Sequence, residues 1–323
     1  MATTIRLLND QSNRKVYNMV PILTLLLILL LALLWLGLNY RQLYIAWATG
    51  SETQRLATLA ADAPDEFQNP ALVEDRFAGR LSSDFWKFTT INGGGEVSNE
   101  LTWHSAAITV NDALTIQHFP DPLFTSESSA RAPRGPEQYN NVSLIGGSGF
   151  RPSKTKDVVL QFSARASEKF YGTGGVIFQP VGTLQKDGFF AKPFDMFGFS
   201  VVGPESSFRG VTGPLCYLAL KSIPSQVKSL QVDAQSLHTY EIRLRWIERT
   251  KWLGTVKVDD EVQCQIDMPA FGPVEVHVWS DNALVLHEPR RWWEFGSAMD
   301  FKCQDGGEKQ FSLGMIQIFE EAR

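Results

Sequence analysis

A tryptophan, a carboxylate and an amide lie close together near the end of a predicted strand, in the sequence Trp279-Ser280-Asp281-Asn282. Sugar rings dock on flat aromatic side chains because their axial C–H faces are apolar, and sugar hydroxyls bind planar amide and carboxylate groups. His277 shares a face with Trp279, because side chains two residues apart in a strand point the same way. Trp279, Asp281, Asn282 and His277 are therefore candidate ligand-binding residues. The competing interpretation is structural: Trp279 packs under a loop, and Asp281 and Asn282 form a turn.

The strand that carries these residues is predicted from side-chain alternation. Between residues 274 and 279, valines alternate with Glu275, His277 and Trp279. A period of two with one apolar face is typical of a half-buried strand. The same period occurs over 240–246 and on both sides of an acidic turn at 259–261, which predicts a hairpin. We therefore expect antiparallel sheet over 238–282.

Three short strings in this region, HTYEIRLRW, VDDEVQ and VWSDN, resemble the later strands of concanavalin A-like jelly rolls. In particular they resemble the family 16 glycoside hydrolases, laminarinases and lichenases, and their non-catalytic relatives. The resemblance extends from Glu74 to the C terminus, where short β-prone runs are separated by Gly, Ser and Asn turns. It implies an all-β, concanavalin A-like jelly-roll β-sandwich over residues 73–323.

The resemblance does not bring catalytic residues with it. Family 16 enzymes carry an E-x-D-x-E string, whose period of two puts a nucleophile and a general acid on one face of a strand. The segment that most resembles it is PFDMF, residues 193–197, in which Pro193 and Phe197 replace the glutamates and only Asp195 remains. Asp195 is kept as a candidate ligand-binding residue. The chain is expected to be non-catalytic, and the alternative is a glycoside hydrolase that uses other carboxylates.

Other function classes lack their usual signals. A formal net charge of -5, without a long run of Lys or Arg, argues against nucleic-acid binding. The five histidines show no metal-ligand spacing, and there is no phosphate-binding glycine loop, zinc-protease motif or serine-hydrolase elbow. We expect no metal site and no cofactor.

The three cysteines, Cys216, Cys264 and Cys303, form no CxxC pair and allow at most one intramolecular disulfide. Buried free thiols are the favoured interpretation. The alternative is a disulfide that involves Cys303, because the polar segment 302–309 has few other means of being held.

The N-terminal region predicts a membrane anchor. Residues 19–38 contain no charge, and about twenty apolar residues in a helix span the hydrocarbon core of a bilayer. Arg6, Arg14 and Lys15 precede this run, and Lys and Arg are enriched on the cytoplasmic side. The alternative is a cleaved signal peptide, since Ala46-Trp47-Ala48 has the small-x-small form of a cleavage site.

Four segments follow from these patterns. We expect a cytoplasmic tail over 1–17, a transmembrane helix over 18–40, a juxtamembrane stalk or linker over 41–72, and the sandwich over 73–323. The chain would be a single-pass membrane protein with an extracytoplasmic C-terminal domain, or a secreted protein if the signal is cleaved.

Three functions are compatible with this organisation. The first is a non-catalytic domain that binds carbohydrate or another surface ligand, with a polysaccharide or glycan as the expected partner. The second is a glycoside hydrolase with unrecognised carboxylates. The third is a structural or assembly module of a membrane-associated system.

Overall fold

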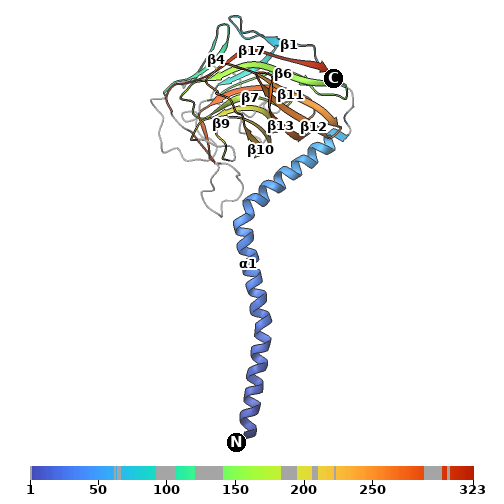
Figure 1. Cartoon of the computed structure of the whole chain (residues 1–323), viewed down its shortest axis with the longest axis vertical. Helices are drawn as coiled ribbons and strands as arrows, with labels where there is room; N and C mark the ends of the chain where they lie inside the picture. Colours follow the sequence, from blue (N-terminus) through green and yellow to red (C-terminus); the bar gives the residue numbers. More distant parts are fainter. Residues whose placement is uncertain are drawn as a thin grey trace.

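The computed structural model describes residues 2–61, 63, 67–91, 106–120, 141–182, 195–205, 210–221, 223–286, 300–303 and 306–323. A two-layered β-sandwich lies at one end of a long bent helix, α1 (Ala2–Ala61), whose N terminus is far from the sheets (Figure 1). All described strand pairs are antiparallel. The predicted all-β sandwich is therefore confirmed.

One layer is an eight-stranded sheet. Its strands, in spatial order, are β13 (Glu261–Pro269), β12 (Lys251–Val258), β11 (His238–Glu248), β6 (Lys156–Ala166), β17 (Lys309–Ala322), β4 (Leu114–His118) and β3 (Ala106–Val110), and β1 (Val73–Asp75) also pairs with β17.

The other layer is a seven-stranded sheet. Its strands, in spatial order, are β10 (Ile223–Ser229), β9 (Gly213–Leu220), β8 (Met196–Val202), β7 (Thr173–Pro180), β14 (Val274–Asp281), β5 (Asn141–Phe150) and β2 (Trp86–Ile91). A separate pair consists of β15 (Ala283–Leu286) and β16 (Asp300–Cys303).

The hairpin predicted from alternation is confirmed. Strands β12 and β13 pair from Lys251↔Pro269 to Val258↔Glu261. Asp259 and Asp260 connect them with φ angles of 49° and 68°. Two consecutive positive φ angles match the twist of a tight β-hairpin, and aspartate tolerates them better than most residues.

The core lies between the two sheets and is rich in aromatic side chains. Phe162 of β6 stacks on Tyr240 of β11 with ring centroids 5.3 Å apart. Phe197 of β8 points across the core to β12, where Gly254 leaves space for its ring: a Cβ at this glycine would lie 2.4 Å from Phe197 Cζ. This contact fixes which face of β8 is internal.

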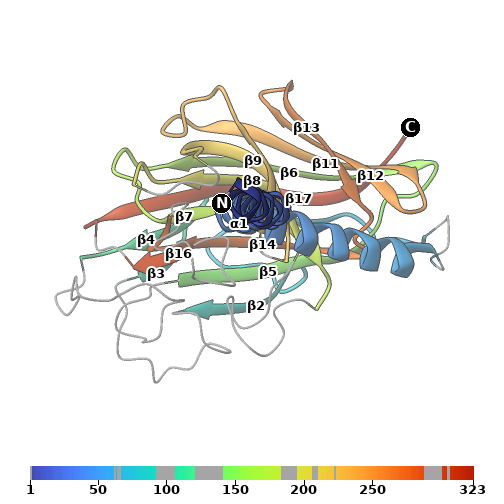
Figure 2. The ribbon, with the colours of Figure 1, turned by 90° about the horizontal axis from the view of Figure 1, so that it is seen from below.

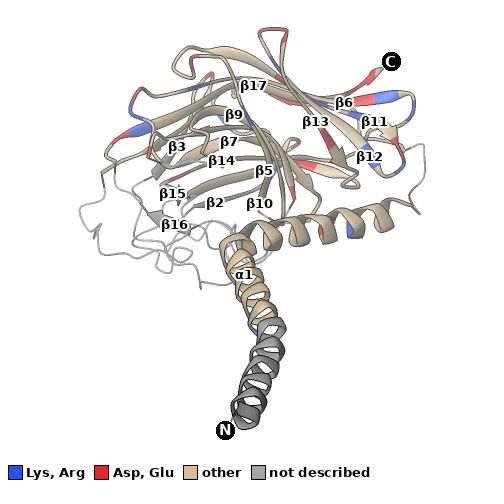
Figure 3. Cartoon of the chain, turned by 60° about the horizontal axis from the view of Figure 1, so that its bottom comes forward, with Lys and Arg blue, Asp and Glu red and all other residues tan. Residues whose placement is uncertain are grey.

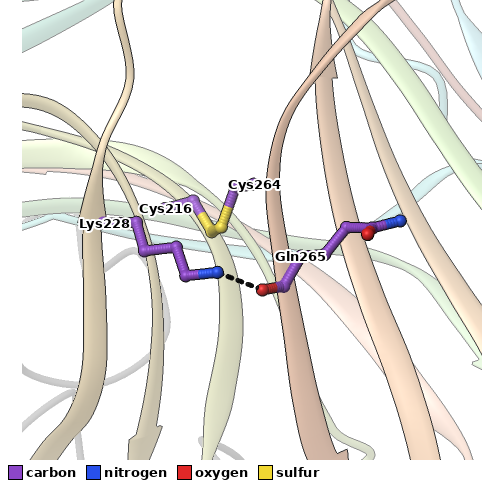
Figure 4. The surroundings of a disulfide bond; sticks show 4 residues. All are labelled: Cys216, Lys228, Cys264 and Gln265. Carbon is purple, nitrogen blue, oxygen red and sulfur yellow. Dashed lines mark hydrogen bonds between the residues drawn. A yellow bond between two sulfur atoms is a disulfide. The ribbon is translucent and has the colours of Figure 1, made fainter.

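A disulfide joins the two sheets, and the expectation for the cysteines is corrected. Cys216 of β9 bonds to Cys264 of β13, with Cα atoms 6.4 Å apart (Figure 4). The expectation of free thiols is therefore wrong at Cys216 and Cys264, and the bond does not involve Cys303. The pairing depends on β9 and β13 being close in the folded sandwich, although they are 48 residues apart in sequence.

Helix α1 changes direction near residue 41. The pieces Thr24–Tyr40 and Gln42–Ala61 meet at 61°, and the first is seen nearly end-on in Figure 2. Among the described residues, no single helix is long and apolar enough to cross a membrane, although these two pieces together pass on length and composition. The transmembrane helix over 18–40 stays a prediction.

The second piece of α1 falls within the predicted stalk. Its side chains Ala48, Glu52, Leu56 and Ala60 are 1–4% exposed. Leu56 and Ala60 belong to the main hydrophobic core. Over this part of residues 41–72, the chain therefore packs on the sandwich.

Candidate functional site

The candidate residues of β14 lie on the face of the strand opposite the core. Val276 and Val278 belong to the core between the sheets, whereas Trp279 belongs to a second cluster on the opposite face. The alternation therefore predicted the two faces of this strand. We call the second face, centred on Glu275, His277, Trp279 and Asp281 of β14 and Thr173 of β7, the Trp279 face.

The Trp279 ring lies across the neighbouring strand. Trp279 is paired with Gly175 of β7, and a Cβ on that glycine would lie 2.8 Å from Trp279 Cη2. The missing side chain gives the indole its place on the sheet. The indole N–H donates to Thr173 Oγ1 at 3.0 Å, which fixes the ring in its plane.

The Asp281 carboxylate accepts hydrogen bonds from the same threonine. The backbone N–H of Thr173 donates to Asp281 Oδ1 at 3.0 Å, and the Thr173 hydroxyl is 3.0 Å from both carboxylate oxygens. Trp279, Thr173 and Asp281 thus form one hydrogen-bonded chain at the end of β14. Asn282 follows directly and is 2% exposed.

His277 lies beside Trp279, with ring centroids 5.4 Å apart. Burial lowers the pKa of His277 to about 3, because the charged imidazolium is disfavoured away from water. The ring is therefore neutral at physiological pH and presents one N–H donor and one nitrogen acceptor.

Further polar groups lie on the same face. Gln179 Nε2 donates to Glu275 Oε1 at 3.0 Å, and the Tyr217 hydroxyl lies 2.9 Å from Met196 Sδ. Polar groups are costly to bury unless they are hydrogen-bonded. These two contacts pair polar groups of this buried face with one another.

The candidate residues are not on an open surface. His277 is 0% exposed, Asp281 1%, and Trp279 and Asn282 2%. Trp279 lies on the face opposite the valines, and this face is covered, as in the structural interpretation of Trp279. Alternation identified the correct face of the strand, but whether a face is covered depends on tertiary structure.

Asp195 is not brought to this face. It precedes β8 and shares the parity of Phe197, which points into the core. Its carboxylate accepts the backbone N–H of Lys221 at 3.0 Å and lies 3.5 Å from Arg55 Nη2 of α1. At Asp195 and Phe197, the parity that the match assigns to the catalytic face therefore points toward the core, so the match of residues 193–197 to E-x-D-x-E fails in orientation there. Pro193 lies outside the described residues.

A buried lysine that belongs to no sequence motif supports the Trp279 face from the core side. Lys309 of β17 is 0% exposed, and its ammonium donates to the backbone carbonyls of Tyr171 at 2.7 Å and of Asp281. It also lies 4.3 Å from the ring centroid of Phe170. Burial lowers the pKa of Lys309 to about 7, against the nearby charge of Asp281.

The signal for Lys309 was present in the sequence. Phe311 and Leu313 of β17 are core residues, and Lys309 shares their parity. Extending the alternation of Phe311 and Leu313 by two residues toward the N terminus places Lys309 on the internal face. Glu52 is a similar case, because it lies four residues from Ala48 and from Leu56 on the buried face of α1.

The described acids of the Trp279 face do not form a glycosidase pair. Glu275 and Asp281 are six residues apart on one strand, which is about 20 Å at about 3.3 Å per residue. Retaining and inverting glycosidases need carboxyl groups about 5 to 9.5 Å apart. No group of three His, Cys, Asp or Glu side chains suited to a metal was found among the residues that the structure describes.

Two cavities lined by described residues lie away from these side chains. One, of about 280 Å³, is lined by polar residues of the eight-stranded sheet and its loops, including Arg165, Glu168 and Gln310. The other, of about 420 Å³, is formed by the segment from Glu74 to Asp84. Neither contains a residue of the Trp279 face.

Comparisons with known proteins return the kinds of structure that the strand pattern resembles. No protein-family model matches the chain, and no curated protein matches it. Solved structures similar to it include the endo-1,3-β-glucanase of Streptomyces sioyaensis, with 9% identity, a TM-score of 0.44, and coverage of 81% of this chain and 100% of that chain. A prokaryotic lichenase derived from a mouse hindgut metagenome has 14% identity, a TM-score of 0.42 and coverage of 77% and 99%.

The carbohydrate recognition domain of Emp47p is also similar, with 16% identity, a TM-score of 0.39, and coverage of 74% of this chain and 96% of that chain. The neighbours are thus glucanases and carbohydrate-recognition domains, as the resemblance implied. At these identities and TM-scores, the likeness carries no inference about the ligand or activity of this chain.

Proposed function

We propose that this chain is a single-pass membrane protein whose extracytoplasmic β-sandwich binds carbohydrate without cleaving it. The anchoring is supported by twelve large apolar side chains between residues 25 and 38 that are 48–77% exposed. Residues 24–40 of α1, the coloured part before its bend, carry no Lys, Arg, Asp or Glu (Figure 3). An apolar surface of this size is unfavourable in water and marks a membrane or protein contact.

The extracytoplasmic location is supported by two independent features. The Cys216–Cys264 disulfide is typical of oxidising compartments, because cytosolic reductants keep thiols reduced. The basic residues before the apolar run favour a cytoplasmic N terminus. Both features favour an extracytoplasmic sandwich.

The carbohydrate part of the proposal rests on one observation: the Trp279 ring lies across Gly175, hydrogen-bonded to Thr173 and beside the Asp281 carboxylate. A flat aromatic with adjacent hydroxyl and carboxylate groups suits a sugar ring. Since Trp279 is 2% exposed, binding requires neighbouring residues to move and uncover the ring. The expected absence of cleavage is supported by the separation of Glu275 and Asp281, the described acids of this face.

The experiment uses the full chain in lipid nanodiscs, because Leu56 and Ala60 of α1 belong to the core. Glycan-array binding is measured beside a reducing-sugar release assay. We expect binding that is lost in Trp279→Ala and retained in part in Trp279→Phe, with no sugar release. Binding that is unchanged in Trp279→Ala would refute the site, and sugar release would favour the glycoside hydrolase.

The burial of the candidate residues favours one other function. If the Trp279 face never opens, its polar groups serve packing, and the chain is a structural or assembly module. Protection of the Trp279 indole N–H from hydrogen exchange to the level of global unfolding, together with no glycan binding, would support this second function.

A further inference from the structure

The second piece of α1, Gln42–Ala61, has two different faces. Ala48, Glu52, Leu56 and Ala60 recur every four residues and are buried. Residues four apart lie on the same side of a helix, so these side chains form one stripe. This stripe contacts β9, β10 and β13 of the sandwich. We call Gln42–Ala61 the arm.

The contact between the arm and the sandwich includes ion pairs as well as apolar packing. Glu52 lies 3.3 Å from Lys221 Nζ and accepts a hydrogen bond from Arg55 Nε at 2.6 Å. Arg55 also reaches Asp195. Lys221 follows β9, and Asp195 precedes β8, so charged groups connect the arm to two places on the seven-stranded sheet.

The C-terminal end of the arm is held separately. Arg249, in the turn between β11 and β12, donates to the backbone carbonyl of Ala61 at 3.0 Å. The arm is thus fixed to the seven-stranded sheet near its middle and to the eight-stranded sheet at its end. A helix fixed at two points cannot swing as a flexible linker does.

The first turns of the arm expose large apolar side chains on the other face. Trp47 is 68% exposed, Leu43 41% and Tyr44 37%. The Tyr44 and Trp47 rings are neighbours, with centroids 6.1 Å apart. Farther along the same face, the exposed residues include Thr53, Gln54 and Thr58, which are polar. Leu59, near the other end of the arm, is 61% exposed, so three of the four exposed large apolar side chains of the arm lie next to the bend.

We infer that the Tyr44–Trp47 pair binds the glycerol and headgroup layer of a phospholipid bilayer, so that the arm holds the sandwich rigidly against the membrane surface. This inference rests on the anchoring part of the proposed function. Tyr and Trp are enriched at that layer because one end of each ring is apolar and the other is polar. The pair follows the exposed run of residues 25–38 on the same helix, and so lies where that run would leave the bilayer.

The length of the helix sets how close the sandwich lies. Ala48, the first buried residue of the arm, packs with Ile223 of β10. Ten residues separate it from Leu38, which corresponds to about 15 Å at 1.5 Å per residue. The end of the seven-stranded sheet near Ile223 is therefore held next to the headgroups. The ligands within reach of the sandwich are accordingly glycans that lie at the membrane surface.

The test measures tryptophan fluorescence of the full chain in phosphatidylcholine vesicles. Vesicles with bromine near the glycerol end of the acyl chain quench shallow tryptophans, and vesicles with bromine near the chain terminus quench deep ones. Trp47→Phe removes an exposed side chain and keeps the fold. Trp246→Phe, on β11 of the sandwich, is the matched control.

We expect the shallow bromine to quench wild type and Trp246→Phe by the same amount, and Trp47→Phe by clearly less. Equal quenching of all three chains, with the protein still retained in the membrane after alkaline carbonate extraction, would overturn the inference and leave the anchoring intact. Release of the chain by carbonate, or a mass that shows cleavage after Ala48, would instead overturn the anchoring.

Discussion

The Cys216–Cys264 bond allows the most quantitative prediction. It closes a loop with a sequence separation of 48 residues and connects β9 of one sheet to β13 of the other. In the chain-entropy treatment, a crosslink over about 49 residues removes about 14 cal/mol/K from the unfolded chain, or about 4 kcal/mol at 25 °C. We expect the double variant Cys216→Ala, Cys264→Ala to lower the free energy of unfolding by about this amount.

The assay is urea unfolding of the full chain in a mild detergent, followed by near-ultraviolet circular dichroism. Cys303→Ala is the matched control, because it leaves the bonded pair intact and should unfold like wild type. Without reductant, the denatured wild type should label with one maleimide per chain. Three labels per chain, or a double variant as stable as wild type, would refute the reasoning.

Three further predictions follow from buried groups. Burial raises the pKa of Asp195 to about 7. The contribution of this carboxyl group to the free energy of unfolding is therefore full below pH 4 and is lost as pH rises toward 7. In thermal unfolding, Asp195→Asn should gain stability relative to wild type between pH 5 and pH 8. Lys309→Met leaves carbonyls of the sheet end unpaired and should cost about 1–3 kcal/mol in urea unfolding. Gly175→Ala puts a Cβ 2.3 Å from the Phe199 backbone carbonyl oxygen and 2.8 Å from Trp279 Cη2, so β7 must move relative to β8 and the Trp279 ring must shift, seen as a change in tryptophan fluorescence. Gly50→Ala, with nothing within 4 Å, should leave the fluorescence unchanged.

Each of these has a distinct contradicting result. A constant difference between Asp195→Asn and wild type at all pH values would show that this carboxylate does not titrate near neutrality. Unchanged stability of Lys309→Met would mean that water replaces the ammonium. A Gly175→Ala chain with wild-type fluorescence would show that the indole does not lie on that strand.

The strands could be predicted because alternation is a local property. Val276 and Trp279 lie on opposite faces of β14, as their spacing requires, and the turn at Asp259 and Asp260 follows from residues that accept positive φ. The sequence left open whether Trp279 is buried or binds a ligand, because its burial depends on chain elements distant in sequence. The disulfide pairing has the same origin, since only the folded sandwich brings β9 next to β13.

The orientation of Asp195 shows a different limit. Matching residues 193–197 to a catalytic string assumed that the strand presented the same face, and Phe197 in the core shows the opposite for the described part. The sequence did contain the correction: Phe197 and Phe199 are apolar at the parity of Asp195. A motif match that does not establish which face of the strand carries the acids is therefore insufficient to identify a catalytic carboxylate.

Side chains of β10 contact the backbone of β13, and this contact has a consequence for association between molecules. These are terminal strands of their sheets, and such strands invite pairing with another chain. Here Lys228 Nζ donates to the Gln265 carbonyl (Figure 4), Gln226 Nε2 donates to the Asp267 carbonyl at 3.2 Å, and Pro224 at a bulge lacks an N–H donor. The two edges thus block each other, and the disulfide keeps them together. Reduction would remove the covalent part of this protection and leave the side-chain hydrogen bonds, so we expect the reduced chain to associate through these edges more readily than the oxidised chain.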